Sequence, residues 1–501
     1  MSRLKVLIMA LLALSLLLCR LSTWCKTLIL SQLNAPKAVQ RWWWRLLVLP
    51  FLLLISIAFY ALLITVASPP ERPVIPFLPV WMLGFLPYLV GSSYVLMTKP
   101  LTGRWFWVEL SVILLGALIF RVMLLPLEPG SRDAWRYLWD ARVIVHSYSP
   151  YVYAPGDTVL RPLWNILYQN ARYRNVPTEY PPAAEAIYVI SYFLDPQNLL
   201  GLKSIFIVLD MITCGALTWL LARRGLDPRR VLIYAWCPLP IVEFALEGHL
   251  DVIVVMFTVL AVLASTSHRE GARALTGFFI ALGTLSKFYT IFLLVVLIRR
   301  RDWALLLTCF LTIMLGYVPF LILGHGEATG ALFSSENLAG TNAGPVQQVL
   351  HWVSYGFHLN EANTLSLEHI TSLFAISIIS LTVFTLRKPS PISIEAATLV
   401  LVSTVLAISP HVFPWYTVGL LPWIAVLAGP LWSSKKPNAK GIAVAAVWYL
   451  NFAVLLSYVP SVALWNTTPI WFVYYATAYG VVLLGLAIAS LVALASPKQL
   501  L

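Results

Sequence analysis

The chain has 501 residues, of which 60% are hydrophobic and 11% charged, and its formal net charge is +13. Many apolar runs approach the roughly 20 residues that a helix needs to cross a bilayer, which excludes a soluble globular protein. A membrane β-barrel would show alternating short segments instead, so we expect an all-α polytopic membrane protein with about 13–15 transmembrane helices. The positive charge lies mainly in short loops between apolar runs, which indicates membrane topology and argues against nucleic acid as a partner.

The apolar runs define the expected elements in chain order. They fall near residues 3–19, 43–67, 74–98, 104–126, 199–222, 230–246, 249–266, 272–285, 287–298, 302–323, 366–386, 393–409, 412–431, 441–459 and 470–495. Two polar stretches are longer than ordinary connections and are expected to be folded, functional loops. The resulting division is 1–103, N-terminal extra helices; 104–126, one helix; 127–198, a first outer loop; 199–323, central helices; 324–365, a second outer loop; and 366–501, C-terminal helices.

Lysine and arginine predict the orientation. Placing the basic loops after residue 199 in the cytoplasm lets the later helices alternate and puts both long loops outside. Residues 181–195 are apolar but short, and a crossing there would invert every later loop, so we expect a re-entrant or interfacial helix. The topology of residues 1–42 stays open, because the basic segment 20–45 and a span at 3–19 make conflicting demands.

The stretch "SRDAWRYLWDARV" (131–143) concentrates polar residues in this apolar chain. Asp133, Arg136, Tyr137 and Asp140 follow the i, i+3, i+4, i+7 spacing of one helical face. A solvated ladder of salt bridges is the simplest interpretation. The following "SPYVYAP" and "VPTEYPP" indicate rigid loops with aromatic walls, which suit polar ligands such as sugars. A carboxylate at the mouth of such a pocket can act as a general base.

These segments resemble the first outer loop of GT-C glycosyltransferases, especially bacterial polyprenyl-phosphate-mannose-dependent mannosyltransferases. The resemblance rests on "RDAWRYLWDARV", "SPYVYAP" and "VPTEYPPAAEAIY", extends from about Arg121 to Tyr416, and departs from the family at Ala141 and Ser149. It implies a GT-C-like helix bundle in a bacterial plasma membrane, with the active site on the outer face. The implied reaction moves a hexose, best guess mannose, from polyprenyl phosphate to an acceptor glycan or glycolipid. No tightly bound cofactor is implied.

The resemblance assigns Asp133 the role of catalytic base. An acceptor hydroxyl must lose its proton as it attacks the anomeric carbon, and an inverting transfer needs one such base. Other residues of this loop are expected to support the acceptor or the loop itself: Arg136, Tyr137, Asp140, Glu179 and Tyr180.

A second polar group lies in "VEFALEGHLD" (242–251), where one apolar run ends and the next begins. The family has a similar turn, which Glu243, His249 and Asp251 match. Ionisable residues at membrane depth are costly and often functional. We expect these residues to bind the acceptor or to shape the loop. His249 and Asp251 also form a weak metal pair, but spacing shows no third ligand, so no metal is assigned and dependence on a divalent ion stays open.

The donor site is expected at two further places. Lys287, between two half-length apolar runs, and Arg121, near the end of its span, are candidates for contact with the donor phosphate. A snorkelling lysine is the alternative for Lys287. In "SPHVFPWYTVGLLP" (409–422), Trp415, Tyr416 and His411 are expected to wall the donor site, although an interfacial aromatic belt gives the same residues.

Two other classes of function stay open. A transporter or flippase of lipid-linked saccharides also needs many helices and a polar cavity, but no internal repeat is visible. A non-catalytic subunit of an envelope-assembly complex would not need the face of Asp133. The sequence names neither the sugar, the acceptor, the linkage nor the oligomeric state.

Overall fold

The computed structural model describes residues 43–67, 74–331, 342–386, 392–433, 436–460 and 467–495. The expected span at 3–19 and the open segment 1–42 lie outside them. Contacts divide the chain into Met1–Leu53 and Leu54–Leu501. The first unit contributes only the beginning of helix α3 to the described residues, and everything below belongs to the second.

The N-terminal helices match the expected spans. They are α3 (Trp43–Ala67), α4 (Val74–Leu83), α5 (Phe85–Met97) and α6 (Arg104–Leu124). The run predicted at 74–98 is interrupted at Gly84, whose amide bonds to both Val80 and Trp81. Tyr60 of α3 packs its ring against Phe120 of α6, with 4.8 Å between the centroids.

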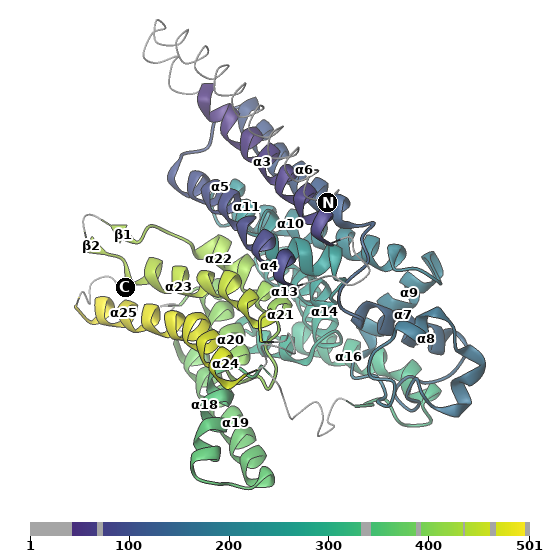
Figure 1. Cartoon of the computed structure of the whole chain (residues 1–501). Coiled ribbons are helices and arrows are strands. Elements are labelled where there is room, and N and C mark those ends of the chain that lie inside the picture. Colours follow the sequence, from purple (N-terminus) through teal and green to yellow (C-terminus); the bar gives the residue numbers. More distant parts are fainter. Residues whose placement is uncertain are drawn as a thin grey trace, which may run out of the picture. The chain divides into compact units, whose positions relative to one another are not determined.

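The segment 127–198, predicted to be the first outer loop, is folded. It contains α7 (Asp133–Val145), the 3-10 helix η1 (Thr158–Leu163), α8 (Ile166–Asn170) and α9 (Pro182–Leu194). Helix α7 packs against α8 and α9 (Figure 1). The helix expected at 181–195 is therefore present, and its depth in a membrane stays a prediction.

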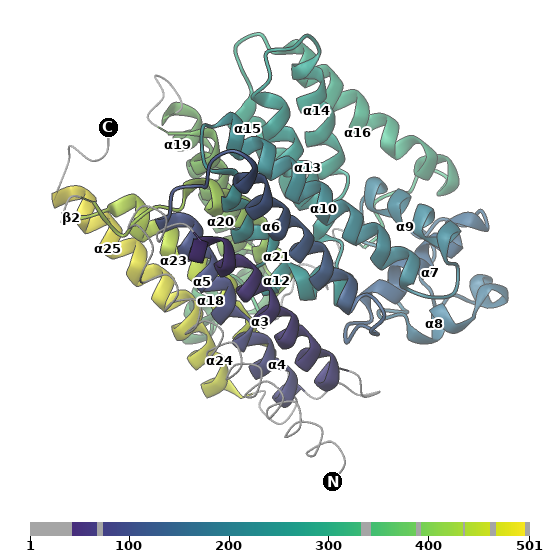
Figure 2. The same ribbon diagram turned by 90° about the horizontal axis from the view of Figure 1, so that it is seen from above.

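The central region contains several short helices. The elements are α10 (Leu200–Arg223), η2 (Pro228–Val231), α11 (Leu232–Ala235), α12 (Pro238–Pro240), the π-helix η3 (Ile241–Leu246), α13 (Asp251–Ser265), α14 (Ala272–Thr284), η4 (Phe288–Phe292), α15 (Leu293–Leu297) and α16 (Trp303–Leu323). Helix α14 packs between α13 and α16 (Figure 2).

The run predicted as one span at 230–246 is broken. Pro238 has no amide hydrogen to donate, and Cys237 before it adopts an extended backbone. Side chains from neighbouring helices satisfy carbonyls around the break. Tyr88 donates to Ile233 O at 2.8 Å, and Arg121 donates to Ala235 O at 2.9 Å. Apolar character predicted the segment, but it did not reveal that the backbone would change direction inside it.

The C-terminal part begins with a helical hairpin, which starts inside the segment 324–365 that was predicted to be the second outer loop. The elements are α18 (Pro345–Gly356), α19 (Glu361–Leu386), α20 (Ile394–Ile408), α21 (Pro414–Thr417), η5 (Val418–Leu420), α22 (Leu421–Leu427), α23 (Ala439–Ala453), η6 (Val454–Tyr458), α24 (Thr468–Tyr475), the π-helix η8 (Ala476–Gly480) and α25 (Val481–Ala495). Strands β1 (Trp432–Ser433) and β2 (Lys436–Pro437) pair antiparallel, with Trp432 opposite Pro437.

Eight helices in the described part of the chain are long and apolar enough to cross a membrane, and six further apolar helices have 10 to 17 residues. The expected all-α membrane architecture is confirmed.

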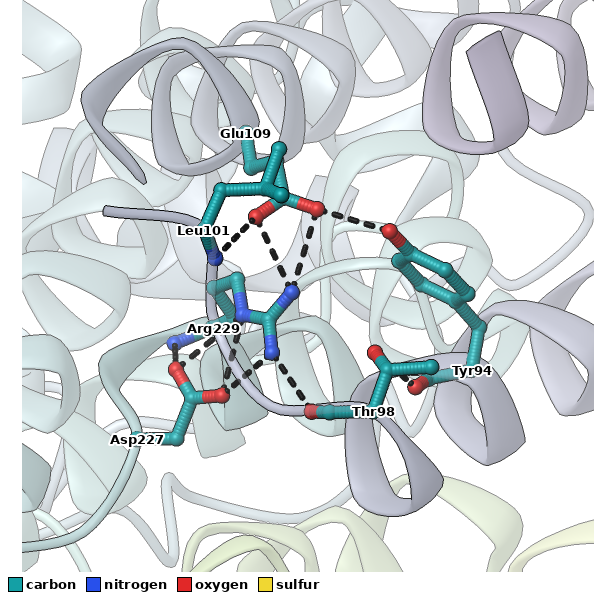
Figure 3. A network of polar contacts seen from close by, with 6 residues as sticks. All are labelled: Tyr94, Thr98, Leu101, Glu109, Asp227 and Arg229. Atoms are coloured by element: carbon teal, nitrogen blue, oxygen red, sulfur yellow. Dashed lines mark hydrogen bonds and ion pairs between the residues drawn. The ribbon is translucent and has the colours of Figure 1, made fainter. Parts of the chain in front are cut away.

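A buried charge network fastens α5, α6 and η2 together at the loops predicted to be cytoplasmic (Figure 3). Arg229 pairs with Glu109 at 3.0 Å and with Asp227 at 2.7 Å, and it donates to Thr98 O at 2.8 Å. Tyr94 donates to the same Glu109 carboxylate. Because the Arg229 side chain is fully buried, these partners replace the water that its charge would otherwise require.

Candidate active site

The turn between η3 and α13 brings a group of ionisable residues together. The π-helical winding of η3 lets Glu247 N donate to Val242 O, and His249 N donates to Glu243 O, both at 2.9 Å. Gly248 has a φ of 72°, a conformation that glycine adopts without steric cost. A Cβ on Gly248 would lie 3.3 Å from the Cβ of Ala134. Glycine therefore allows the turn to lie directly against the first turn of α7, where Asp133 is.

His249 lies between two carboxylates. Its Nδ1 is 2.8 Å from Glu243 Oε2, and its Nε2 is 3.8 Å from Asp133 Oδ2. Tyr458 donates to the other oxygen of Glu243 at 3.0 Å. Burial by itself lowers the pKa of His249, but the hydrogen bond and charge of Glu243, with Asp133 and Glu247, outweigh it and raise the pKa above its ordinary value. This arrangement favours a positive charge on His249 next to Asp133.

An aromatic stack holds the other face of the His249 ring. Trp415 lies parallel to it with 3.6 Å between the centroids. Phe413 stacks on Trp415 at 4.7 Å, and His411 stacks on Phe413 at 5.8 Å. The stack fixes the orientation of the imidazole toward Asp133, and it places two of the three residues expected at the donor wall in one row.

A second group close by consists of Lys287, Asp251 and Tyr416. The Lys287 ammonium is 2.7 Å from Asp251 Oδ1 and 3.5 Å from the centre of the Tyr416 ring. Burial lowers the pKa of Lys287, whereas Asp251, Glu179 and Asp133 act in the opposite direction. Lys287 therefore contacts one residue of the turn, Asp251, and one of the aromatic segment 409–422, Tyr416, and it lies within the electrostatic influence of Asp133 and Glu179.

The remaining polar residues of α7 hold the loop in place. Arg136 pairs with Asp140 at 2.8 Å and donates to Tyr173 O and Val176 O. Burial raises the pKa of the Asp140 carboxyl, and Arg136 opposes that effect. The solvated ladder is therefore not what forms at this pair, because both side chains are almost completely buried.

Tyrosine packing supports the same loop. The ring of Tyr137 stacks on Tyr188 at 4.5 Å and meets Tyr180 edge-on at 5.1 Å. Before α7, the Lys203 ammonium donates to carbonyls at the end of α6, including Leu125 O at 2.8 Å. Glu247 accepts hydrogen bonds from the amides of Gly130 and Ser131 at 2.7 and 2.8 Å. These contacts position the start of α7 and with it Asp133.

A cavity of about 1270 Å³ adjoins this group. On the near side it is lined by Ser131, Glu247, His249, Trp415 and Tyr458. Its opposite wall comes from α18, the start of α19, and α24, which sequence reasoning did not single out. Tyr458 was missed too, because its hydrogen bond to Glu243 joins positions 215 residues apart. The two glutamines and the tryptophan of α18 were the sequence feature that could have indicated this wall.

Arg121 lies elsewhere. Its fully buried guanidinium pairs with Asp210 Oδ2 at 2.6 Å and donates to the carbonyls of Ala117 and Ala235. This ion pair joins α6 to α10. Within the ranges given above, no group of three or more His, Cys, Asp or Glu side chains is arranged to hold a metal ion.

Residues 178–410 match the family model described as glycosyltransferase family 87. The match confirms the expectation that the chain is a glycosyltransferase; it includes the turn and Lys287 but not Asp133. Among solved structures, the chain shows a likeness to a crystal structure of ArnT from Cupriavidus metallidurans bound to undecaprenyl phosphate. The TM-score is 0.42 with 16% identity, over 79% of this chain and 72% of that chain. No curated protein sequence matches the chain.

Proposed function

From a membrane chain that matches a glycosyltransferase family, we propose a transferase that uses a polyprenyl-phosphate sugar as donor. It moves a hexose, best guess mannose, to an acceptor glycan or glycolipid at the outer face of a bacterial plasma membrane. The reaction inverts the anomeric carbon, with Asp133 as its base. The observation that carries this proposal is the position of Asp133, which is partly exposed and 3.8 Å from His249 of the cavity wall.

The proposed step needs one proton transfer. The acceptor oxygen forms a bond to the anomeric carbon while its proton passes to the Asp133 carboxylate. The bond between the anomeric carbon and the phosphate oxygen breaks, and its electron pair leaves with the polyprenyl phosphate anion. A second carboxylate acting as nucleophile or acid, as in glycoside hydrolysis, is not required.

His249 is a positioning residue in this scheme. When protonated, it donates Nδ1–H to Glu243 and directs Nε2–H toward Asp133. When His249 is neutral, its single ring proton stays on Nδ1, in the hydrogen bond to Glu243. The unprotonated Nε2 then faces the Asp133 carboxylate. Two acceptors that face one another repel, and the base loses its fixed orientation.

Lys287 is proposed to bind the donor phosphate. An ammonium has three N–H donors, and Asp251 occupies one of them. The other two suit a phosphate, whose developing negative charge a lysine stabilises as a point charge. Tyr416, under the ammonium, and Trp415 and His411 in the aromatic row give the expected walls of the donor site. Arg121 is assigned no part in it, since its side chain is fully buried.

The test uses purified protein in liposomes, a panel of polyprenyl-phosphate sugars, and a membrane extract as acceptor source. We expect release of sugar from one donor by the wild type and loss of release in Asp133→Asn. Adding donor only to the outer or only to the inner leaflet of oriented vesicles tests the proposed face. Release from no donor by folded protein, with acceptor present, would contradict the proposal.

The same liposomes test the alternatives of a transporter or flippase and of a non-catalytic envelope subunit. A flippase would move a labelled donor lipid between leaflets without breaking the sugar–phosphate bond, and Asp133→Asn would have no necessary effect on that movement. A non-catalytic subunit would do neither.

A further inference from the structure

The far wall of the cavity has no part in the chemistry above. It is formed by α18, the first turns of α19, and α24, and it opens onto the same space as His249 and Trp415. The cavity volume exceeds the roughly 300–1,000 Å³ of pockets for drug-sized ligands. The space therefore extends beyond what one transferred sugar occupies.

Helical spacing turns one face of each helix toward this space. Helix α18 contributes Gln348, Trp352 and Tyr355, which are spaced i, i+4, i+7. Helix α24 contributes Trp471, Phe472 and Tyr475, and Tyr475 follows the other two by four and three residues, about one helical turn. A wall made of amide and aromatic side chains results.

Trp352 is a fixed but accessible platform. Its ring meets Tyr475 edge-on at 5.9 Å and Phe472 at 6.2 Å, and Tyr475 is itself held by donating to Ala343 O at 2.9 Å. The Trp352 residue is nevertheless 43% exposed. The C–H faces of a sugar ring stack on such a surface, and a ring held in advance loses little conformational freedom on binding.

Amide groups beside the platform supply polar contacts. Gln348 lines the cavity, and its side chain makes no hydrogen bond within the part of the chain that the structure describes. Asn342 also lines the cavity, and its Nδ2 donates to Val412 O. An amide both donates and accepts hydrogen bonds, which matches the hydroxyl groups of a sugar.

The charge of the far wall disfavours an anionic ligand. Glu368 is acidic, and the described residues of α18, α19 and α24 that line the cavity include no lysine or arginine. His351 is 3.5 Å from Glu368 and offsets that carboxylate only when protonated. Phosphate or uronate groups would meet like charges here.

From these features we infer that the wall of α18 and α24 is an acceptor subsite for an uncharged oligosaccharide. The inference rests on the proposed function, which it deepens by naming the acceptor class and the surface that binds it. A polyprenyl tail fits the wall less well, because it would cover Gln348 and Glu368 without satisfying their polar groups.

The test measures binding and needs no turnover. The full chain in detergent micelles is mixed with mannotetraose, cellotetraose, chitotetraose and tetragalacturonate, and binding is measured by saturation-transfer difference NMR. We expect at least one neutral tetrasaccharide to bind. Trp352→Ala and Gln348→Ala should each weaken it about 10-fold, as expected for loss of one central contact. Gln348→Ala removes no hydrogen bond within the described part of the chain, and so keeps the test valid should Trp352→Ala fail to fold.

Two matched variants serve as controls. Trp303→Ala removes an exposed tryptophan outside the cavity, and Gln197→Ala removes an exposed glutamine of the first outer loop; both should bind as the wild type does. Binding by none of the neutral tetrasaccharides, equal binding of tetragalacturonate, or unchanged binding by both cavity variants would overturn the subsite.

Failure of the subsite is distinguishable from failure of the proposed function. The Asp133→Asn variant should bind the tetrasaccharide with wild-type affinity, although it has lost sugar transfer. Sugar transfer that proceeds normally in Trp352→Ala and Gln348→Ala would reject the subsite and leave the transferase proposal intact.

Discussion

Replacing Glu243 with glutamine removes the negative charge that faces His249 inside the turn. The two groups are 2.8 Å apart, and both side chains are almost completely buried. At an effective dielectric constant of about 20, unit charges at this distance attract by about 6 kcal/mol, so Glu243 contributes strongly to the raised pKa of His249. Because burial lowers the pKa of His249, loss of this attraction should leave the imidazole neutral near pH 7.

The expected result is a shift in the pH dependence of kcat/KM. In the wild type, activity is lost as pH rises through the raised pKa of His249, because the deprotonated ring no longer orients Asp133. In Glu243→Gln the alkaline limb should move at least about one unit toward acid. The assay is sugar release from the donor between pH 5 and pH 9, with NMR titration of the His249 ring as the direct readout.

Tyr458→Phe is the matched control. It removes the 3.0 Å hydrogen bond to the other oxygen of Glu243 but keeps the charge, so the alkaline limb should stay near its wild-type position. An alkaline limb that does not move in Glu243→Gln, or that moves toward higher pH, would refute the reasoning about His249.

Two further substitutions separate the donor site from the scaffold. Lys287→Ala should raise the donor KM more than it lowers kcat at saturating donor, and the reverse pattern in steady-state kinetics would remove Lys287 from the phosphate site. Arg121→Leu leaves the Asp210 carboxylate buried without its cation and should cost about 3–5 kcal/mol of stability, whereas Arg121→Leu combined with Asp210→Leu should recover most of it. Thermal unfolding in detergent compares the two, and a single variant as stable as the double one would contradict a buried ion pair that supports the bundle.

The long helices could be predicted from the sequence because membrane-length apolar runs carry that signal without tertiary information. The spans at 43–67, 104–126, 199–222 and 302–323 all correspond to continuous helices. The run at 230–246 does not, because Pro238 interrupts it, and the run at 412–431 divides into α21, which begins at Pro414, the 3-10 turn η5 and α22. Composition alone gives such segments the same hydropathy whether they are straight or broken, and the side chains that satisfy the freed carbonyls come from other helices.

The candidate site divides in a similar way. Asp133, His249 and Trp415 stand in short motifs with an unusual density of acids and aromatics, and the structure brings these motifs together. Tyr458 and Trp352 lie in apolar or amphipathic sequence without a distinctive motif, and only the packing of distant helices places them on the cavity. Arg121 and Asp210 were both visible as charges within apolar runs, but their pairing across 89 positions was not.

The central claim is that Asp133 removes the acceptor proton. The most direct measurement compares donor affinity and turnover for the wild type, Asp133→Asn and Asp195→Asn, the last being an aspartate of the same loop that caps local amides. The account predicts that Asp133→Asn lowers turnover about 10²–10⁴-fold with little change in donor affinity, while Asp195→Asn stays near the wild type. Turnover by Asp133→Asn at the wild-type rate would contradict it.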